Sequence, residues 1–169
     1  LSVFLKAKAL EEEGKKIIHL EVGEPDFKPP KEVKTALEEV YDKGYGKYGS
    51  PKGITELRHV LAMECAGWNK KLDDGVLTPI HTDNIMICPG ARFAVYLAIT
   101  TLLNPGDEIV VIEPSWPAYK DCALNAGIKV RTIKTTLETK WEPSIEQINN
   151  AINENTKMII LNSPNNPTG

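Results

Sequence analysis

The sequence predicts an α/β fold built on a mostly parallel sheet that helices cover on both faces. From residue 84 onward, short apolar runs alternate with longer segments of helical periodicity. Turns that contain Gly and Pro separate the two kinds of segment, as at Pro89-Gly90 and at Asn104-Pro105-Gly106. Strands that alternate with helices of this length indicate a parallel sheet, because a parallel connection needs a crossover helix.

Length and composition suit one globular domain or part of a larger one. The 169 residues are 41% hydrophobic and 25% charged, with a net charge of −3. This charge gives no electrostatic reason to expect nucleic acid or an anionic membrane as a partner. No apolar run approaches the roughly 18 residues of a membrane-spanning helix. No signal peptide is recognisable, and the chain begins at Leu1 rather than Met, so we expect its natural start to lie upstream.

The cysteines and histidines predict neither a disulfide framework nor a metal site. The cysteines are odd in number and lack a Cys-x-x-Cys spacing, so we expect free thiols in a reducing cytoplasm. The histidines are scattered, with no pair four residues apart and no cysteine nearby, so we expect core or surface histidines and no metal. These residues are Cys65, Cys88 and Cys122, and His19, His59 and His81.

Residues 1–45 are expected to form a segment that leads into the sheet domain. A short amphipathic helix over 4–13 is followed by an alternation at 18–22 that predicts a strand. Gly23 lets the main chain approach a ligand closely, although a tight turn would explain it equally well. From Lys31, apolar residues on one face predict a second helix: Val33, Ala36, Leu37, Val40 and Tyr41.

Residues 44–49, Gly-Tyr-Gly-Lys-Tyr-Gly, match the letters of the dinucleotide fingerprint G-x-G-x-x-G. A helix is expected before them, where the fingerprint requires a strand, so we reject a dinucleotide site. A glycine-rich loop remains, and the hydroxyl of Tyr48 in that loop can donate to a phosphate.

Residues 46–169 supply the strands and helices of the sheet domain. Ser50-Pro51 opens a helix whose inward positions are expected to be Ile54, Leu57, Val60, Leu61 and Cys65. A surface connection follows over 69–82. Strands are then expected at 85–88, 109–112, 128–133 and 158–161, with helices at 91–103, 116–126 and 144–153. The helix at 91–103 is nearly all apolar and should be buried, and the helix at 144–153 begins with a capping-box spacing, Ser144 to Gln147.

Two strand ends offer groups that suit a phosphorylated aromatic ligand. The helix that follows Gly90 presents free N–H groups at Ala91 and Arg92, together with the positive end of its dipole, to an anion. Trp116, between two prolines, offers a flat face to an aromatic ring, and packing in the core is the alternative.

The third strand end carries Asn162, Asn165 and Asn166, whose amides we expect to be free, and a plain polar turn is the alternative. Ligands of open α/β sheets gather beyond the carboxyl ends of the strands. The three strand ends together therefore predict a site for a planar, phosphorylated aromatic cofactor.

These motifs, in this order, resemble those of the class I and II aminotransferases, which are fold-type I enzymes that bind pyridoxal 5'-phosphate (PLP), and most of all those of the aspartate aminotransferase kind. The matching stretches are 20–27, 48–53, 89–92, 114–116 and 162–169. The resemblance implies the fold-type I architecture. Residues 1–45 would then be a small-domain part and a lead-in, and residues 46–169 the N-terminal part of the PLP-binding large domain.

The resemblance also implies roles for single residues. It assigns to the cofactor Tyr48, Gly90, Ala91, Arg92, Trp116 and Asn166. It assigns to the substrate Gly23, Arg92, Trp116 and Asn166. Because Tyr48 would reach the cofactor phosphate of the neighbouring subunit, the resemblance implies a homodimer with shared active sites.

The implied activity is transamination between an amino acid and a 2-oxo acid in the cytoplasm. Arginine binds carboxylates in a two-point fork, so Arg92 favours a dicarboxylic donor such as aspartate. Arg92 could instead reinforce the phosphate site or pair with an acid on the surface. A lyase or synthase on the same scaffold, and a non-catalytic ligand-sensing domain, remain alternatives for the protein.

The family's Schiff-base lysine, its aspartate at the pyridine nitrogen and its arginine for the substrate α-carboxylate lie downstream of the last matching motif. No catalytic residue is therefore expected in this chain. The chain also stops at 162–169 without the helix that a parallel sheet needs next. We expect it to be the front half of a longer enzyme and to be inactive by itself.

Overall fold

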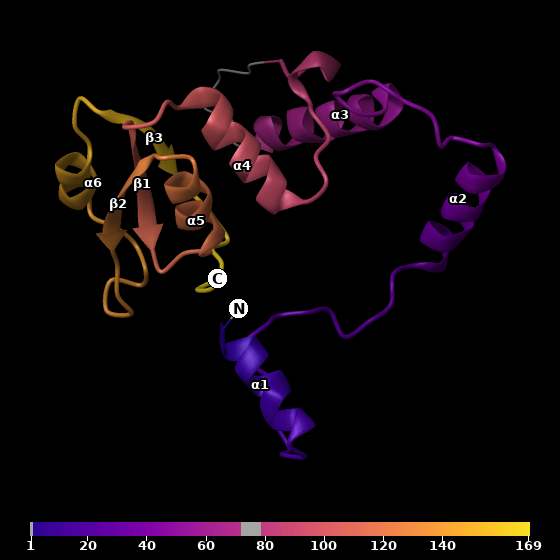
Figure 1. The fold of residues 1–169 in the computed structure, drawn as a ribbon. Coiled ribbons are helices and arrows are strands. Elements are labelled where there is room, and N and C mark those ends of the chain that lie inside the picture. The colour runs from indigo at the N-terminus through magenta and orange to yellow at the C-terminus, as the bar shows by residue number, and fades with distance from the viewer. Residues whose placement is uncertain (1, 72–78) are drawn as a thin grey trace. The chain divides into compact units, whose positions relative to one another are not determined.

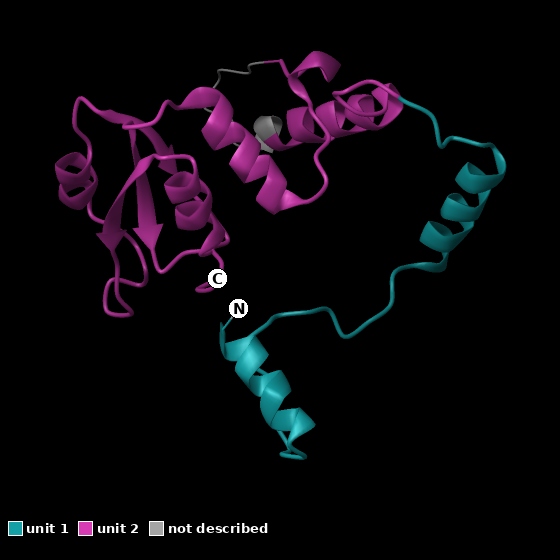
Figure 2. Cartoon of the chain, in the orientation of Figure 1, with its two compact units in different colours: residues 1–48 teal, residues 49–169 magenta. Residues whose placement is uncertain are grey.

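The computed structural model describes residues 2–71 and 79–169, and the chain divides into two compact units (Figure 2). Unit 1 is residues 1–48, and unit 2 is residues 49–169. The regular elements described in unit 1 are helices, whereas unit 2 contains the sheet. The strand ends that carry the predicted ligand site therefore belong to unit 2.

Unit 1 has two helices, α1 (Ser2–Glu12) and α2 (Lys31–Asp42), joined by an irregular segment. Both helices were predicted, and Gly14 follows α1 with a left-handed φ of 83°. The strand predicted at 18–22 is wrong: the segment is irregular, and Ile18 and Leu20 are 82% and 90% exposed. A strand needs a second strand to bind its main chain, and the described residues of unit 1 supply none.

A histidine between two carboxylates holds this irregular segment to α1. Nδ1 of His19 lies 2.6 Å from Oε1 of Glu21, and Nε2 lies 2.8 Å from Oε1 of Glu11. The hydrogen bond with Glu11, followed by the one with Glu21, raises the pKa of His19, because both carboxylates favour the protonated ring. Hydrogen bonds of the His19 side chain thus hold the segment for which main-chain hydrogen bonds of a strand were expected.

Unit 2 holds three parallel strands and several helices, of which α5 and α6 contact the strands (Figure 1). Its elements in chain order are α3 (Thr55–Lys71), η1 (Thr82–Asn84), α4 (Ala91–Leu102), β1 (Glu108–Glu113), α5 (Ala118–Asn125), β2 (Lys129–Lys134), α6 (Ile145–Ala151) and β3 (Thr156–Ile160). The strand order is β2-β1-β3, with Val110 beside Arg131 on one side and Ile159 on the other. The predicted alternation of strands and helices is confirmed from α4 to β3.

Helices cover both faces of this sheet, as predicted. Side chains of β1 alternate between the faces. Ile109 and Val111 pack on the side of α4 and α5, in a cluster with Ile99, Leu103, Cys122, Ala123 and Ile128. Val110 packs on the other face with Ile133 and with Ala151 of α6. Figure 1 shows α5 and α6 on opposite sides of the strands.

Residues 85–88 do not form the predicted strand. The segment instead contacts the turn before α3: the N–H of Ile87 donates to the Lys52 carbonyl at 2.9 Å. The contact is close, because a Cβ on Gly53 would lie 2.6 Å from the Ile87 side chain. The described sheet consists of β2, β1 and β3, so no strand of it stands beside residues 85–88 to complete a ladder.

The buried face of α3 also differs from the prediction. Ile54, Leu57 and Val60 are exposed, while Leu61 and Cys65 are half-buried. Arg58 takes the inner face, where it donates to the Thr82 carbonyl at 3.0 Å and to Oγ1 of Thr55 at 3.3 Å. The bond to Thr82 holds η1 against α3. The connection was predicted at 69–82, but α3 continues to Lys71. Residues 72–78 of that prediction lie outside the described residues.

Helix α4 is apolar but largely exposed, which corrects the prediction that it is buried. Ile99 is buried, whereas Phe93, Tyr96 and Leu102 are 46%, 42% and 70% exposed. Only one stripe of a helix can face a given layer, and that stripe of α4 packs through Ile99 and Leu103 onto the cluster around α5 and β1.

Local signals placed α6 correctly. Oγ of Ser144 accepts from the N–H of Gln147 at 3.1 Å, and the Gln147 side chain accepts from the N–H of Ser144 at 2.9 Å. This is the predicted capping box, which satisfies two main-chain donors at the start of the helix.

Three further observations concern the described residues alone. Each of the three cysteines is a free thiol, and Cys122 is buried. Within 2–71 and 79–169, no group of His, Cys, Asp or Glu side chains gathers in a way that could hold a metal ion. No helix in those ranges is both long enough and apolar enough to cross a bilayer.

Glu108 ties together the chain at the amino ends of the three strands. Its Oε1 accepts from Nδ2 of Asn153 at 2.5 Å, and its Oε2 accepts from Nη2 of Arg131 at 3.2 Å. Asn153 lies just before β3 and Arg131 lies in β2. The hydrogen bond from Asn153 first, and then the one from Arg131, lowers the pKa of Glu108.

We predict that this carboxylate makes folding acid-sensitive. A lowered pKa means that ionised Glu108 adds stability above its unfolded pKa of about 4.3, and that this stability is lost as the pH falls through the folded value. The free energy of unfolding of the wild type should exceed that of Glu108→Gln at about pH 7, and the difference should shrink below about pH 4. Urea unfolding at several pH values measures this. Glu64→Gln, at an exposed position of α3, is the control, and a difference between wild type and Glu108→Gln that does not change with pH would contradict the prediction.

Candidate active site

The amino end of α4 is open to an anion. Gly90 is its N-cap residue, with φ 89° and ψ 155°, and no side chain caps the helix. This left-handed φ favours glycine. Steric crowding does not require glycine here, because a Cβ would meet no atom within 4 Å. Ala91 and Arg92 occupy the first two helical positions and are exposed. Their N–H groups have no partner within the helix, so the first turn and its dipole favour a bound anion.

Trp116 lies against this helix end. It follows β1, is half-buried, and has the guanidinium carbon of Arg92 5.3 Å from its ring centre. The Tyr119 ring packs edge-on against it, with centroids 5.5 Å apart and planes at 89°. The structure therefore brings together the helix start after Gly90 and the turn after β1, although residues 85–88 before Gly90 are not a strand.

The turn that carries Trp116 is anchored to β2. The Glu113 carbonyl accepts from the N–H of Thr135 at 2.8 Å and from its Oγ1 at 2.7 Å. The Glu113 carboxylate pairs with Nζ of Lys120 in α5, across the same turn. Thr135 is buried, at 8% exposure. Thr135 could not be found from the sequence, because no motif contains it and it lies 22 residues from its partner.

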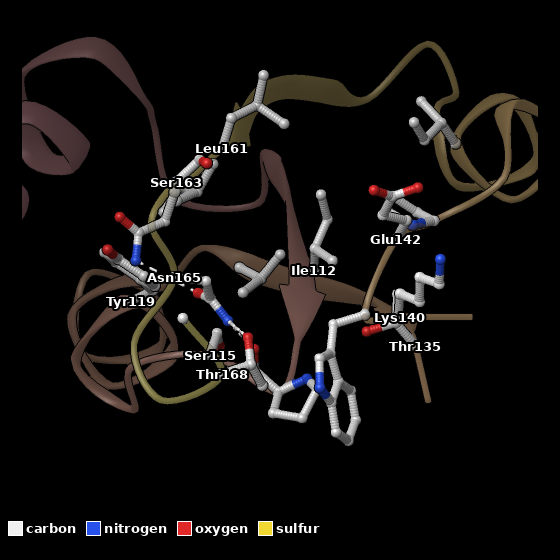
Figure 3. Close-up of a pocket in the computed structure, with 18 residues that line it drawn as sticks. Ile112, Ser115, Tyr119, Thr135, Lys140, Glu142, Leu161, Ser163, Asn165 and Thr168 are labelled. Carbon is white, nitrogen blue, oxygen red and sulfur yellow. Dashed lines mark hydrogen bonds between the residues drawn. The ribbon is translucent and has the colours of Figure 1, made fainter. Parts of the chain in front are cut away.

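The same turn is also bound by the loop after β3. Nδ2 of Asn165 donates to the Pro114 carbonyl at 2.9 Å and to Oγ1 of Thr168 at 2.7 Å (Figure 3). Oδ1 of Asn165 lies 3.3 Å from Nδ2 of Asn162, which donates to it. The prediction that all three asparagine amides are free is therefore wrong for Asn162 and Asn165. Asn166 is exposed.

A cavity of about 360 Å³ lies beside the Trp116 turn (Figure 3). Ser115 and Tyr119 line it from the side of β1, and Asn165 and Thr168 from the loop after β3. The loop after β2 contributes Lys140, Trp141 and Glu142, the first two with left-handed φ values of 53° and 62°. Arg92, Trp116 and Asn166 do not line it. The cavity is thus a neighbour of the predicted ligand site and does not coincide with it.

The other two predicted residues belong to unit 1. Gly23 lies in the irregular segment between α1 and α2, and Tyr48 is the last residue of the unit. Both are exposed, and the Tyr48 side chain makes no hydrogen bond with any other residue that the structure describes. Within unit 2, by contrast, Gly90, Arg92 and Trp116 form one contiguous group.

Chemically, this group offers two complementary surfaces. The uncapped first turn of α4 and the Arg92 guanidinium favour negative charge, while the indole of Trp116 favours a planar ring or a cation. The arrangement suits a ligand that has an anionic group attached to a flat ring.

Comparison with known protein families matches residues 15–169 to the family "Aminotransferase class I and II". An aspartate aminotransferase of Thermotoga maritima is 37% identical over 164 residues, and an aspartate/prephenate aminotransferase of Thermus thermophilus is 36% identical over 171 residues. These alignments cover 97% and 99% of this chain but 42% of each relative. The chain thus spans less than half the length of these relatives.

Solved structures agree with the sequence comparison. The crystal structure of aspartate aminotransferase from Thermotoga maritima has a TM-score of 0.89 at 36% identity, over 99% of this chain and 43% of that chain. An alanine aminotransferase from Pyrococcus furiosus has a TM-score of 0.85 at 35% identity, over 99% and 42%. The similar proteins therefore share a fold but carry the names of different amino acids.

Proposed function

Because this chain belongs to the class I and II aminotransferase family, we propose that the whole protein is a PLP-dependent aminotransferase that moves an amino group between an amino acid and a 2-oxo acid. The observation that carries the proposal is the contact of Arg92, at the open end of α4, with Trp116 at the end of β1. Residues 46–169 would be the first part of the PLP-binding domain, and residues 1–45 a part of the small domain with the lead-in. The free thiols agree with a reducing compartment such as the cytoplasm.

The residues of unit 2 fit PLP in three respects. The N–H groups of Ala91 and Arg92, after Gly90, would hold the phosphate, since the helix has no cap of its own. Trp116 would stack on the ring, and Asn166, exposed on its loop, would bind the 3-oxygen. When bound, PLP supplies an electron sink, and the protein supplies binding and orientation.

Isotope transfer by the whole protein tests this activity. With ¹⁵N-labelled aspartate and 2-oxoglutarate, a transaminase delivers the label to glutamate, and added PLP should support the reaction. Label released as ammonia would indicate a lyase. Bound PLP without any turnover would favour a ligand-sensing domain.

We further propose that residues 1–169 lack the lysine that binds the cofactor covalently and are inactive alone. The 20 Lys and Arg residues of the chain include no lysine in the matching family position. After borohydride treatment of this chain with PLP, peptide mapping should show no single dominant labelled lysine. One stoichiometrically labelled site would overturn the proposal.

Arg92 is our candidate for reading a distal carboxylate of the substrate. The phosphate would already meet the main-chain N–H groups of α4, and the guanidinium lies against Trp116, the proposed stacking residue. A guanidinium binds a carboxylate at two points. This supports aspartate or another dicarboxylic amino acid as the donor, with 2-oxoglutarate as the acceptor.

In the whole enzyme, Arg92→Gln should lower kcat/KM for aspartate about 10–100-fold more than for alanine. This factor corresponds to the loss of one charge-assisted contact of about 1.5–3 kcal/mol. Arg131→Gln is the matched control, because Arg131 binds Glu108 at the opposite edge of the sheet. Equal losses on both substrates would assign Arg92 to the phosphate instead.

We also propose a homodimer in which Tyr48 reaches the phosphate bound by the partner subunit. Tyr48 is fully exposed in unit 1, which leaves its hydroxyl available. Tyr48→Phe should weaken PLP retention about 10–100-fold, as expected for one hydrogen bond to a charged group.

Hybrid dimers distinguish sharing from a site within one subunit. If Tyr48 acts across the dimer, mixing Tyr48→Phe subunits with subunits that lack the cofactor lysine restores one intact site per hybrid. Activity of the mixture should then exceed that of either parent. If it never exceeds the Tyr48→Phe parent, Tyr48 serves its own subunit.

A further inference from the structure

The loop after β3 and the turn after β1 are joined through the side chain of Asn165. The two residues that it connects, Asn165 and Pro114, are 51 positions apart in sequence. Pro114 lies two residues before Trp116, and Asn165 directly precedes Asn166. The bond therefore links the two segments that carry the proposed stacking residue and the proposed amide ligand.

Asn165 has no amide hydrogen left for a ligand. Its Nδ2 donates to the Pro114 carbonyl and to Oγ1 of Thr168, and its Oδ1 accepts from Asn162. Its main-chain carbonyl accepts from the N–H of Gly169 at 2.8 Å. The residue is half-buried, while Asn166 beside it is exposed. The neighbouring asparagines thus differ in environment, one bound within the protein and the other open to a ligand.

The Trp116 turn is held from two sides at successive carbonyls. Thr135 of the β2 side binds the Glu113 carbonyl with its N–H and its hydroxyl, and Asn165 binds the Pro114 carbonyl. Thr135 binds the end of the strand, at the Glu113 carbonyl. The Asn165 bond adds a contact at the next carbonyl and joins the turn to the loop after β3.

We propose that Asn165 is a positioning residue that holds Trp116 and Asn166 in register for the cofactor. The proposal deepens the proposed function, since it takes PLP to be the ligand between them. Asn165 acts through the Pro114 carbonyl and does not itself contact the cofactor.

The decisive variant is Asn165→Asp in the whole protein. Aspartate has the size of asparagine but lacks both N–H donors. Asn150→Asp, at an exposed position of α6, is the control, because it makes the same change of charge at a residue that binds neither Pro114 nor Asn165. Asn165→His is the rescue, because its Nδ1 stands at the same bond separation from Cβ as the amide nitrogen and can donate.

The first measurement uses protein freed of cofactor, so it does not depend on the proposed function. Hydrogen exchange in the segment 114–119 should be faster in Asn165→Asp than in the wild type, unchanged in Asn150→Asp and restored by Asn165→His. Unchanged exchange in Asn165→Asp would overturn the anchoring. If the wild type fails to bind PLP at all, the proposed function fails, while the exchange result still decides whether Asn165 anchors the turn.

The second measurement is PLP retention by equilibrium dialysis, read with the absorption spectrum of the bound cofactor. Asn165→Asp should bind PLP about 5–30-fold more weakly, the range expected for the loss of one or two hydrogen bonds, and Asn150→Asp should bind it as the wild type does. Faster exchange combined with unchanged PLP retention would make the bond purely structural and would overturn the positioning role.

Discussion

Strand β1 is hydrogen-bonded to β2 on one side and to β3 on the other, and unit 2 depends on this double pairing. Ile109, Val110 and Val111 are at most 1% exposed, because helices cover both faces. A slip of one residue would turn every side chain of β1 to the other face and move its end by about 3.3 Å. The register that fills the two apolar clusters therefore also sets where Trp116 begins its turn.

The first turn of α4 carries a cation, Arg92, next to main-chain N–H groups that have no cap. A cation in the first turn faces the positive end of the helix dipole, which is unfavourable. For Arg92, this unfavourable interaction is offset by the π face of Trp116, which attracts the guanidinium and lies 5.3 Å from it. The indole thus keeps positive charge at a place where the main-chain N–H groups already favour an anion. The two elements reinforce one another as an anion site.

Patterns confined to a few neighbouring residues were predictable from the sequence. The apolar run of β1, the Ser144–Gln147 cap and the helix start at Gly90 each follow from local chemistry, and each is confirmed. Two predictions that depended on a distant partner failed. Residues 85–88 have the composition of a strand but no strand beside them, and Arg58 displaced the apolar residues expected on the inner face of α3.

The candidate site divides in the same way. The sequence identified the residue types at the strand ends, and the structure brings Arg92 and Trp116 together. The sequence alone could not show that Asn165 is bound within the protein while Asn166 stays exposed. The two side chains are chemically identical, and only their neighbours in the fold distinguish them. Thr135 carried no signal, since its bond to Glu113 spans a crossover connection.

The anchors of the Trp116 turn recognise main-chain carbonyls, and every amino acid has one. At positions 113 and 114 the bonds from Thr135 and Asn165 do not depend on which side chain is present. At position 165, by contrast, the donor is the side chain itself. Substitutions are thus more restricted at Asn165, whose side chain donates the hydrogen bond, than at positions 113 and 114, whose main-chain carbonyls accept. The side chains on the surface of this turn can therefore change during evolution while the main chain of the turn keeps its place.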